Sequence, residues 1–212
     1  LSQEELEFFP ALILYRAKGK NWDALKKYVE GGGNIYFEPE PKSSQSFADF
    51  VPVINSTTIQ VKDLKFELIR ESVLTKNVYP QKFAPFEYKG EPWKISISQE
   101  VDLNSWAEPV LGYKNYIVLS QGKFGKGNII FSGINLPFHL VEKENSEEIK
   151  LLTNIIMLIT NYPNLKKPVF SVERSIPEKI SAVGENFRGI YFKENYNSGW
   201  KARINDSSAK IY

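Results

Sequence analysis

The feature that most constrains the fold is a strand–helix–strand order near the amino terminus. Residues 11–15, ALILY, form a short all-apolar run of the kind found in buried parallel strands. Residues 21–30 begin with an Asn suited to an N-cap and then place apolar side chains at helical spacing. Residues 34–37, NIYF, form the next strand. Because a helix that joins two strands produces a parallel pair, this order predicts an α/β fold with a mostly parallel sheet.

Three glycines, Gly31 to Gly33, lie between this helix and the second strand. In a phosphate loop the glycines precede a helix, whose free N–H groups then meet the anion. Here they follow a helix, whose end carries a partial negative charge. We therefore interpret them as a helix cap and a turn. A second glycine loop, residues 122–127, joins two strand-like runs, which predicts a hairpin rather than a nucleotide loop.

The rest of the chain divides into two regions of different character. Strands are expected at residues 116–120 and 128–132, and a strong helix from 146 to about 161. After that helix the pattern contains strands only. We expect an α/β domain over residues 1–164 and a β-strand segment of a second, sandwich-like domain over residues 165–212. Both ends look cut, so we expect each domain to be truncated.

Composition excludes several kinds of site. The chain has no Cys, one His and one Met, so thiolate metal sites, disulfides and a Cys nucleophile are ruled out, and we expect no metal and no cofactor. The net charge of +2 is spread along the chain, which argues against nucleic acid as a partner. The most apolar run, residues 149–159, is too short for direct membrane insertion, which takes about 20 residues. Scarce Cys and Met with many Lys and Glu also suggest a thermophile.

Candidate catalytic residues follow the second predicted strand. Ligand sites in open α/β sheets lie beyond the carboxyl ends of the strands, where this chain has Glu38 and Glu40. These carboxylates could serve as acid and base, and His139 as a general base. The sequence has no Gly-x-Ser-x-Gly elbow. The alternative is a solvated Pro-Glu-Pro loop and a His that packs or hydrogen-bonds near a loop.

Two stretches carry a resemblance to a known fold. Residues 22–37, WDALKKYVEGGGNIYF, and residues 125–156, GKGNIIFSGINLPFHLVEKENSEEIKLLTNII, resemble non-catalytic versions of the class I glutamine amidotransferase-like domain. The resemblance extends over about residues 5–162. It implies a three-layer flavodoxin/amidotransferase-like domain with a mostly parallel sheet. It also implies that the first strands of that fold precede Leu1.

The same resemblance implies where chemistry would lie. In the active enzymes of this fold, a Cys sits at an elbow after a central strand and a His follows a later strand. The corresponding positions here are residues 38–41 and Ser132 or Gly133, which supply neither residue, while His139 lies several residues further on. The resemblance therefore implies the fold of a pseudoenzyme and argues against glutaminase activity.

A third stretch resembles a different kind of protein. Residues 188–206, with GIYFKENYNSGWKARIND, are similar to a strand pair in the extracytoplasmic β-sandwich of YfhO-like and glycosyltransferase-like polytopic membrane proteins of archaea and bacteria. The resemblance implies an extracytoplasmic location at the cell membrane. Tyr196 and Trp200 would then be packing residues of the sandwich.

These observations lead to one expected function and two alternatives. We expect a non-catalytic extracytoplasmic domain of a polytopic membrane protein that handles cell-surface glycans or lipid-linked sugars. Its partner would be a glycan, or the rest of its own membrane-embedded chain. Aromatic side chains that could stack on sugars, unless they belong to the core, are Trp93, Trp106, Tyr196 and Trp200. The alternatives are a hydrolase or transferase that uses the carboxylates and the His, and a purely structural spacer.

Overall fold

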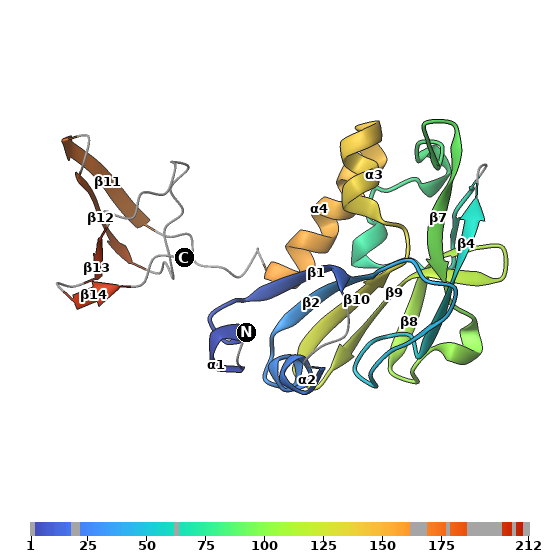
Figure 1. The fold of residues 1–212 in the computed structure, drawn as a ribbon, viewed down its shortest axis with the longest axis horizontal. Coiled ribbons are helices and arrows are strands. Elements are labelled where there is room, and N and C mark those ends of the chain that lie inside the picture. Colours follow the sequence, from blue (N-terminus) through green and yellow to red (C-terminus); the bar gives the residue numbers. More distant parts are fainter. Residues whose placement is uncertain are drawn as a thin grey trace. The chain divides into compact units, whose positions relative to one another are not determined.

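The computed structural model describes residues 3–17, 22–61, 64–161, 169–176, 179–185, 201–204 and 207–209. It divides the chain into two compact units, Leu1–Leu165 and Lys166–Tyr212. The first unit is an α/β structure with a six-stranded and a four-stranded sheet (Figure 1). The second unit has two antiparallel strand pairs, β11 (Val169–Ile176) with β12 (Lys179–Glu185) and β13 (Ala202–Ile204) with β14 (Ser207–Ala209). Its assignment to a β-sandwich stays a prediction.

The main sheet is mixed, so the prediction of a mostly parallel sheet is wrong. Its order is β1-β2-β10-β9-β8-β5. The strands are β1 (Ala11–Ala17), β2 (Asn34–Pro39), β10 (Gly127–Ser132), β9 (Tyr116–Phe124), β8 (Ala107–Tyr113) and β5 (Glu67–Leu68). Only β2 with β1 and β2 with β10 are parallel, and the other pairs are antiparallel.

Short connections explain the antiparallel half. Only Gly125 and Lys126 separate β9 from β10, and only Lys114 and Asn115 separate β8 from β9. A parallel crossover needs a dozen or more residues, so each of these connections can only be a hairpin. The hairpin predicted at residues 122–127 is therefore confirmed. Strand β8 was not predicted, because Pro109 indicated a loop; the register shifts next to this proline, where a strand tolerates it.

The predicted βαβ unit is present as β1, α2 (Trp22–Glu30) and β2. The glycines end α2: Gly31 N–H donates to the Lys27 carbonyl at 2.9 Å, and Gly33 N–H donates to the Tyr28 carbonyl at 2.9 Å. A side chain on Gly33 would lie 2.1 Å from the Tyr28 ring. The triple glycine is therefore a helix cap and a tight corner, as predicted.

The two parallel strands of this unit differ in burial. Every residue of β2 is buried, because β2 lies inside the sheet and its alternate side chains enter the cores on the two faces. Strand β1 was expected to be buried as well, but it lies at the edge of the sheet, with Ile13 53% exposed and Tyr15 40% exposed. Its alternate residues Leu12 and Leu14 pack into the core beside α2. The parallel pairing was predicted correctly, and the burial was not.

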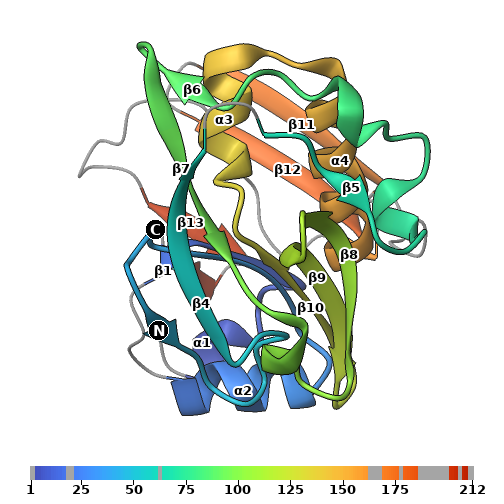
Figure 2. The same cartoon turned by 90° about the vertical axis from the view of Figure 1, so that its right-hand side faces the viewer.

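Each face of the main sheet has its own core. One core lies beneath α4 (Ser146–Thr160) and the 3-10 turn η1 (Val73–Thr75), and the other beneath α2 and the short α1 (Gln3–Leu6). The four-stranded sheet stands beside the main one (Figure 2) and is antiparallel, with β3 (Gln45–Ser46), β4 (Asn55–Val61), β7 (Glu91–Ile97) and β6 (Glu87–Tyr88). A further helix, α3 (Leu136–Lys143), connects β10 to α4 and was not predicted.

Candidate functional site

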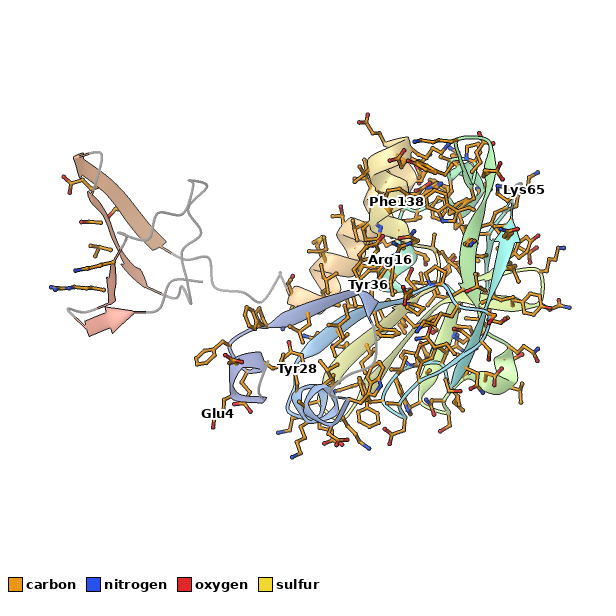
Figure 3. All side chains as sticks on the ribbon, in the orientation of Figure 1. Glu4, Arg16, Tyr28, Tyr36, Lys65 and Phe138 are labelled. Atoms are coloured by element: carbon orange, nitrogen blue, oxygen red, sulfur yellow. The ribbon has the colours of Figure 1, made fainter. Side chains whose placement is uncertain are left out.

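The carboxyl ends of the parallel strands meet at one place, as the strand order requires. Glu38 lies near the end of β2, directly across from Tyr15 of β1. Ser132 is the last residue of the neighbouring strand β10, and α3 begins just beyond it. Arg16 and Tyr36, which also act on Glu38, are both marked in Figure 3. The candidate site is this group of side chains.

Glu38 is buried and accepts several hydrogen bonds on one oxygen. Its side chain is 2% exposed. Oε1 accepts the Ser132 hydroxyl at 2.9 Å, the Leu136 backbone N–H at 2.9 Å and the Tyr36 hydroxyl. The other oxygen, Oε2, is buried without a hydrogen-bond partner. One carboxylate oxygen of Glu38 therefore accepts three hydrogen bonds, and the other accepts none.

Burial dominates the electrostatics of the site. Desolvation raises the pKa of Glu38 to about 7, although hydrogen bonds from Tyr36, Leu136 and Ser132 and the charge of Arg16 act in the opposite direction. Desolvation and the neighbouring Glu38 also raise the pKa of Tyr36 well above its ordinary value, so its hydroxyl stays a donor. Near neutral pH the site therefore holds a carboxyl group divided between its charged and neutral forms.

The first turn of α3 explains why a carboxylate lies here. Asn135 precedes the helix in a left-handed conformation, with φ 62° and ψ 46°, and its side chain makes no capping hydrogen bond. Its Oδ1 instead accepts the Tyr15 hydroxyl at 2.6 Å. Glu38 supplies the missing acceptor for the Leu136 N–H, at the end of the helix dipole that favours negative charge. One established role of Glu38 is thus to cap α3 from a neighbouring strand.

His139 belongs to a different group of buried side chains. It lies in α3 and is fully buried, with Nδ1 2.5 Å from Glu148 Oε2 and its ring stacked on Phe86 at 4.0 Å between centroids. The other oxygen of Glu148 accepts the Ala84 N–H at 2.9 Å. The His139–Glu148 pair therefore links α3 and α4 to the loop that follows the 3-10 turn η2 (Pro80–Lys82). Sequence analysis did not identify Glu148, which lies in the first turn of α4, as a partner of His139.

The described hydrogen bonds do not join the three predicted catalytic residues. Glu38 bonds to β10 and the start of α3, whereas His139 bonds to Glu148 and approaches the Pro85 carbonyl at 3.3 Å. Glu40 is partly exposed and lies 3.6 Å from the Lys42 ammonium. Two surface hollows, one beside Asp102 and one beside Trp106, are lined by other residues. The arrangement keeps Glu38 and His139 in separate networks.

The aromatic candidates have different surroundings. Trp93 is 4% exposed, donates its indole N–H to the Ile134 carbonyl at 3.1 Å and packs against His139, so it has no face to offer a sugar. Trp106 is partly buried and covers Gly122, where a Cβ atom would lie 2.6 Å from its ring. It also lines one of the two hollows. Tyr196 and Trp200 lie outside the described residues.

Two negative findings apply to the part of the chain that the structure describes. In that part, no group of three or more His, Asp or Glu side chains could hold a metal ion. No helix there has both the length and the apolar character needed to cross a membrane.

Comparison with known proteins identifies a fold and no family. No family model matches the sequence, and no curated protein does. Among solved structures, the cytoplasmic protein STM3548 from Salmonella typhimurium matches with a TM-score of 0.52 and 15% identity, over 74% of each chain. The mmIFT52 N-terminal domain matches with a TM-score of 0.53 and 14% identity, over 76% of this chain and 81% of that one. The cytoplasmic protein STM1381 from Salmonella typhimurium LT2 matches with a TM-score of 0.51 and 12% identity, over 74% of this chain and 75% of that one.

At such low identity these likenesses concern the fold alone. They show that the first unit shares a mixed α/β fold with these three proteins. The resemblance of residues 188–206 to membrane proteins falls mostly on residues that the structure does not describe.

Proposed function

We propose that the first unit is a non-catalytic module that acts by binding. The observation that carries this proposal is the state of Glu38, the residue at the strand end where this fold would place its nucleophile. Three donors, from Tyr36, Ser132 and Leu136, converge on one of its oxygens, and the side chain is 2% exposed. A carboxylate committed to capping a helix in this way is a structural group.

His139, another candidate catalytic residue, is also held in place by buried contacts. His139 is fully buried, packed against the Phe86 ring and held by Glu148. A general base must reach the proton that it removes, either directly or through one water. Neither His139 nor Glu38 could do so without opening the core around α3. This geometry favours binding over catalysis.

The test compares turnover with stability. We would measure hydrolysis of amide, ester and glycoside substrates by the wild-type chain, by Glu38→Gln and by His139→Gln. We expect no turnover by any of the three, and a changed midpoint of thermal unfolding for both variants. Turnover by the wild type that disappears in a folded Glu38→Gln variant would contradict the proposal.

One observation favours the enzymatic alternative. Oε2 of Glu38 is buried without a partner, and burial raises the pKa of Glu38 to about 7, in the range that suits a general acid or base. A hydrolase or transferase would need a substrate group in contact with Oε2. The same turnover experiment separates this alternative from the binding module.

The proposed setting is the extracytoplasmic side of a polytopic membrane protein that handles glycans or lipid-linked sugars. Its support is the similarity of residues 188–206 to such proteins. The longer gene product tests it, because a membrane protein would carry apolar runs of about 20 residues outside the present sequence. A complete gene product without such runs would contradict the membrane setting and leave the binding role intact.

A glycan is the proposed ligand that can be tested first. Trp106 is the aromatic candidate of the described residues that lines a surface hollow. We would screen a glycan array with the wild type, with Trp106→Ala and with Tyr79→Ala, a matched control at an exposed aromatic residue that lines neither hollow. Binding lost only in Trp106→Ala would support a glycan site. An array without hits would favour a partner chain or a structural spacer.

A further inference from the structure

Strand β1 has the composition of an interior strand and the position of an edge strand. Its residues 11–15, ALILY, are all apolar, yet among the described strands β1 pairs only with β2. An edge strand presents a row of unpaired backbone N–H and C=O groups to any strand that can dock. Ile13 and Tyr15 are 53% and 40% exposed on the α4 side of this edge.

The exposed apolar surface continues onto α4, which lies beside β1 (Figure 1). On one flank of α4, the Asn154 amide donates to the Leu74 carbonyl of η1, near the far edge of the sheet. By helical spacing, Ile149 and Ile156 lie on the flank opposite Asn154, and they are 49% and 40% exposed. We call Ile13, Tyr15, Ile149 and Ile156, with the outer edge of β1, the β1 edge surface. Apolar side chains gathered in this way mark an interaction site more often than single ones do.

The charges around β1 are arranged so that the strand complements itself. Exposed Glu4 precedes the strand, and exposed Arg16 lies at its end. When two copies of such a strand run antiparallel, the acidic start of each lies toward the basic end of the other. Opposite charges placed in this way favour one partner and one orientation.

We propose that the β1 edge surface binds a second copy of this chain. The two β1 strands would pair antiparallel about a two-fold axis, which joins two six-stranded sheets into one. Centred on Leu14, the pairing places Ile13 opposite Tyr15 of the copy, an aliphatic–aromatic cross-strand pair. The irregularity at Arg16 leaves the register of residues 11–15 intact. The proposal goes beyond the binding function above and holds whether or not the chain is an enzyme.

The α4 flank gives the interface its size. A single strand pair buries less surface than the roughly 1,200–2,000 Å² of a stable interface. In a two-fold arrangement each exposed residue of α4 is contributed twice, so Ile149 and Ile156 of both copies flank the paired strands. The interface therefore needs both elements.

The first test measures the oligomeric state of the 212-residue chain by sedimentation over a wide concentration range. We expect a dimer that dissociates on dilution. Ile13→Lys places a charge at the centre of the interface and should raise the dissociation constant by about tenfold or more. Val101→Lys is the matched control, because Val101 is 81% exposed in the 3-10 turn η3 (Glu100–Asp102), outside the β1 edge surface. The control should dimerise like the wild type, and circular dichroism should show both variants folded.

A second test uses the absence of Cys from the chain. Chains with Ile13→Cys and chains with Tyr15→Cys are mixed and oxidised. The proposed register predicts a disulfide between the two variants, and none in a mixture in which Val101→Cys replaces the first. A chain that stays monomeric at every concentration overturns the proposal and leaves another polypeptide strand as the occupant of β1. A dimer that Ile13→Lys leaves unchanged, and that the paired Cys variants do not cross-link, overturns it too.

Discussion

Two buried ionisable groups lie on either side of the start of α3, and they are satisfied to different degrees. At His139, both ring nitrogens and both oxygens of its partner Glu148 have polar neighbours. At Glu38, one oxygen has three donors and the other has none. A fully paired buried group mainly stabilises a fold, whereas a half-paired one stores free energy that a proton or a ligand can release. Both groups are therefore structural, but only Glu38 keeps a buried oxygen without a hydrogen-bond partner.

The largest effect is expected at the fully paired group. His139→Ala leaves a Glu148 oxygen without its partner in the core and opens a cavity beside the Phe86 and Trp93 rings. We expect a loss of about 3–5 kcal/mol in the free energy of unfolding, the usual cost of removing one partner from a buried pair. Urea unfolding at one pH measures it. A loss below about 1 kcal/mol would show that the pair contributes little.

The next largest effect is a pH dependence of the free energy of unfolding, which we expect from Glu38. Burial raises the pKa of Glu38 from 4.5 to about 7, so the native state holds a proton that the unfolded chain releases. Its contribution is fully present below pH 4.5 and is lost as pH rises to about 7, for a total of about 3 kcal/mol. Urea unfolding at pH 5 and pH 8 measures it. Glu38→Gln, which cannot ionise, is the control, and an equal pH dependence in both chains would refute the assignment to Glu38.

A smaller effect is expected from one donor to Glu38. Ser132→Ala removes a hydroxyl whose hydrogen bond lowers the pKa of Glu38. We expect a loss of about 1–2 kcal/mol at pH 8, where the carboxylate is charged, and a smaller loss at pH 5. The measurement is again urea unfolding at both values. Ser120→Ala is a matched control, since that buried hydroxyl has no hydrogen-bond partner.

The smallest effect on stability is expected at Glu40, the third predicted catalytic residue. Glu40 lies 3.6 Å from Lys42, and both side chains are partly exposed. Pairs of this kind contribute about 0–1 kcal/mol. Glu40→Gln should therefore leave the unfolding midpoint nearly unchanged at both pH values. A large loss would place Glu40 in the same class as the two buried groups.

Sequence analysis predicted the local part of the fold well. The β1–α2–β2 unit, its glycine corner and helix α4 depend on neighbouring residues, such as Asn145, which caps α4 through the Glu147 and Glu148 N–H groups. The partners of a strand depend on distant residues. This explains why the edge position of β1 and the addition of β8 to the sheet were missed, although the β9–β10 hairpin was predicted. Helix α3 was missed because it begins at a left-handed Asn135 and takes its cap from Glu38, 98 residues away from Leu136.

Sequence analysis predicted where the candidate site lies, but not which residues would donate hydrogen bonds to Glu38. The rule that ligand sites follow the carboxyl ends of parallel strands led to Glu38. Nothing near Glu38 in the sequence indicated Ser132 or the start of α3 as its donors, because those contacts cross the sheet. Likewise, Glu148 meets His139 only because α3 and α4 pack together.

The half-paired carboxyl group of Glu38 has a calorimetric consequence. Between pH 4.5 and 7 the native chain carries a proton there, and unfolding transfers that proton to the buffer. The heat absorbed on unfolding then includes the heat of protonating the buffer. The apparent unfolding enthalpy should therefore differ between phosphate and imidazole at pH 6, by an amount that Glu38→Gln reduces.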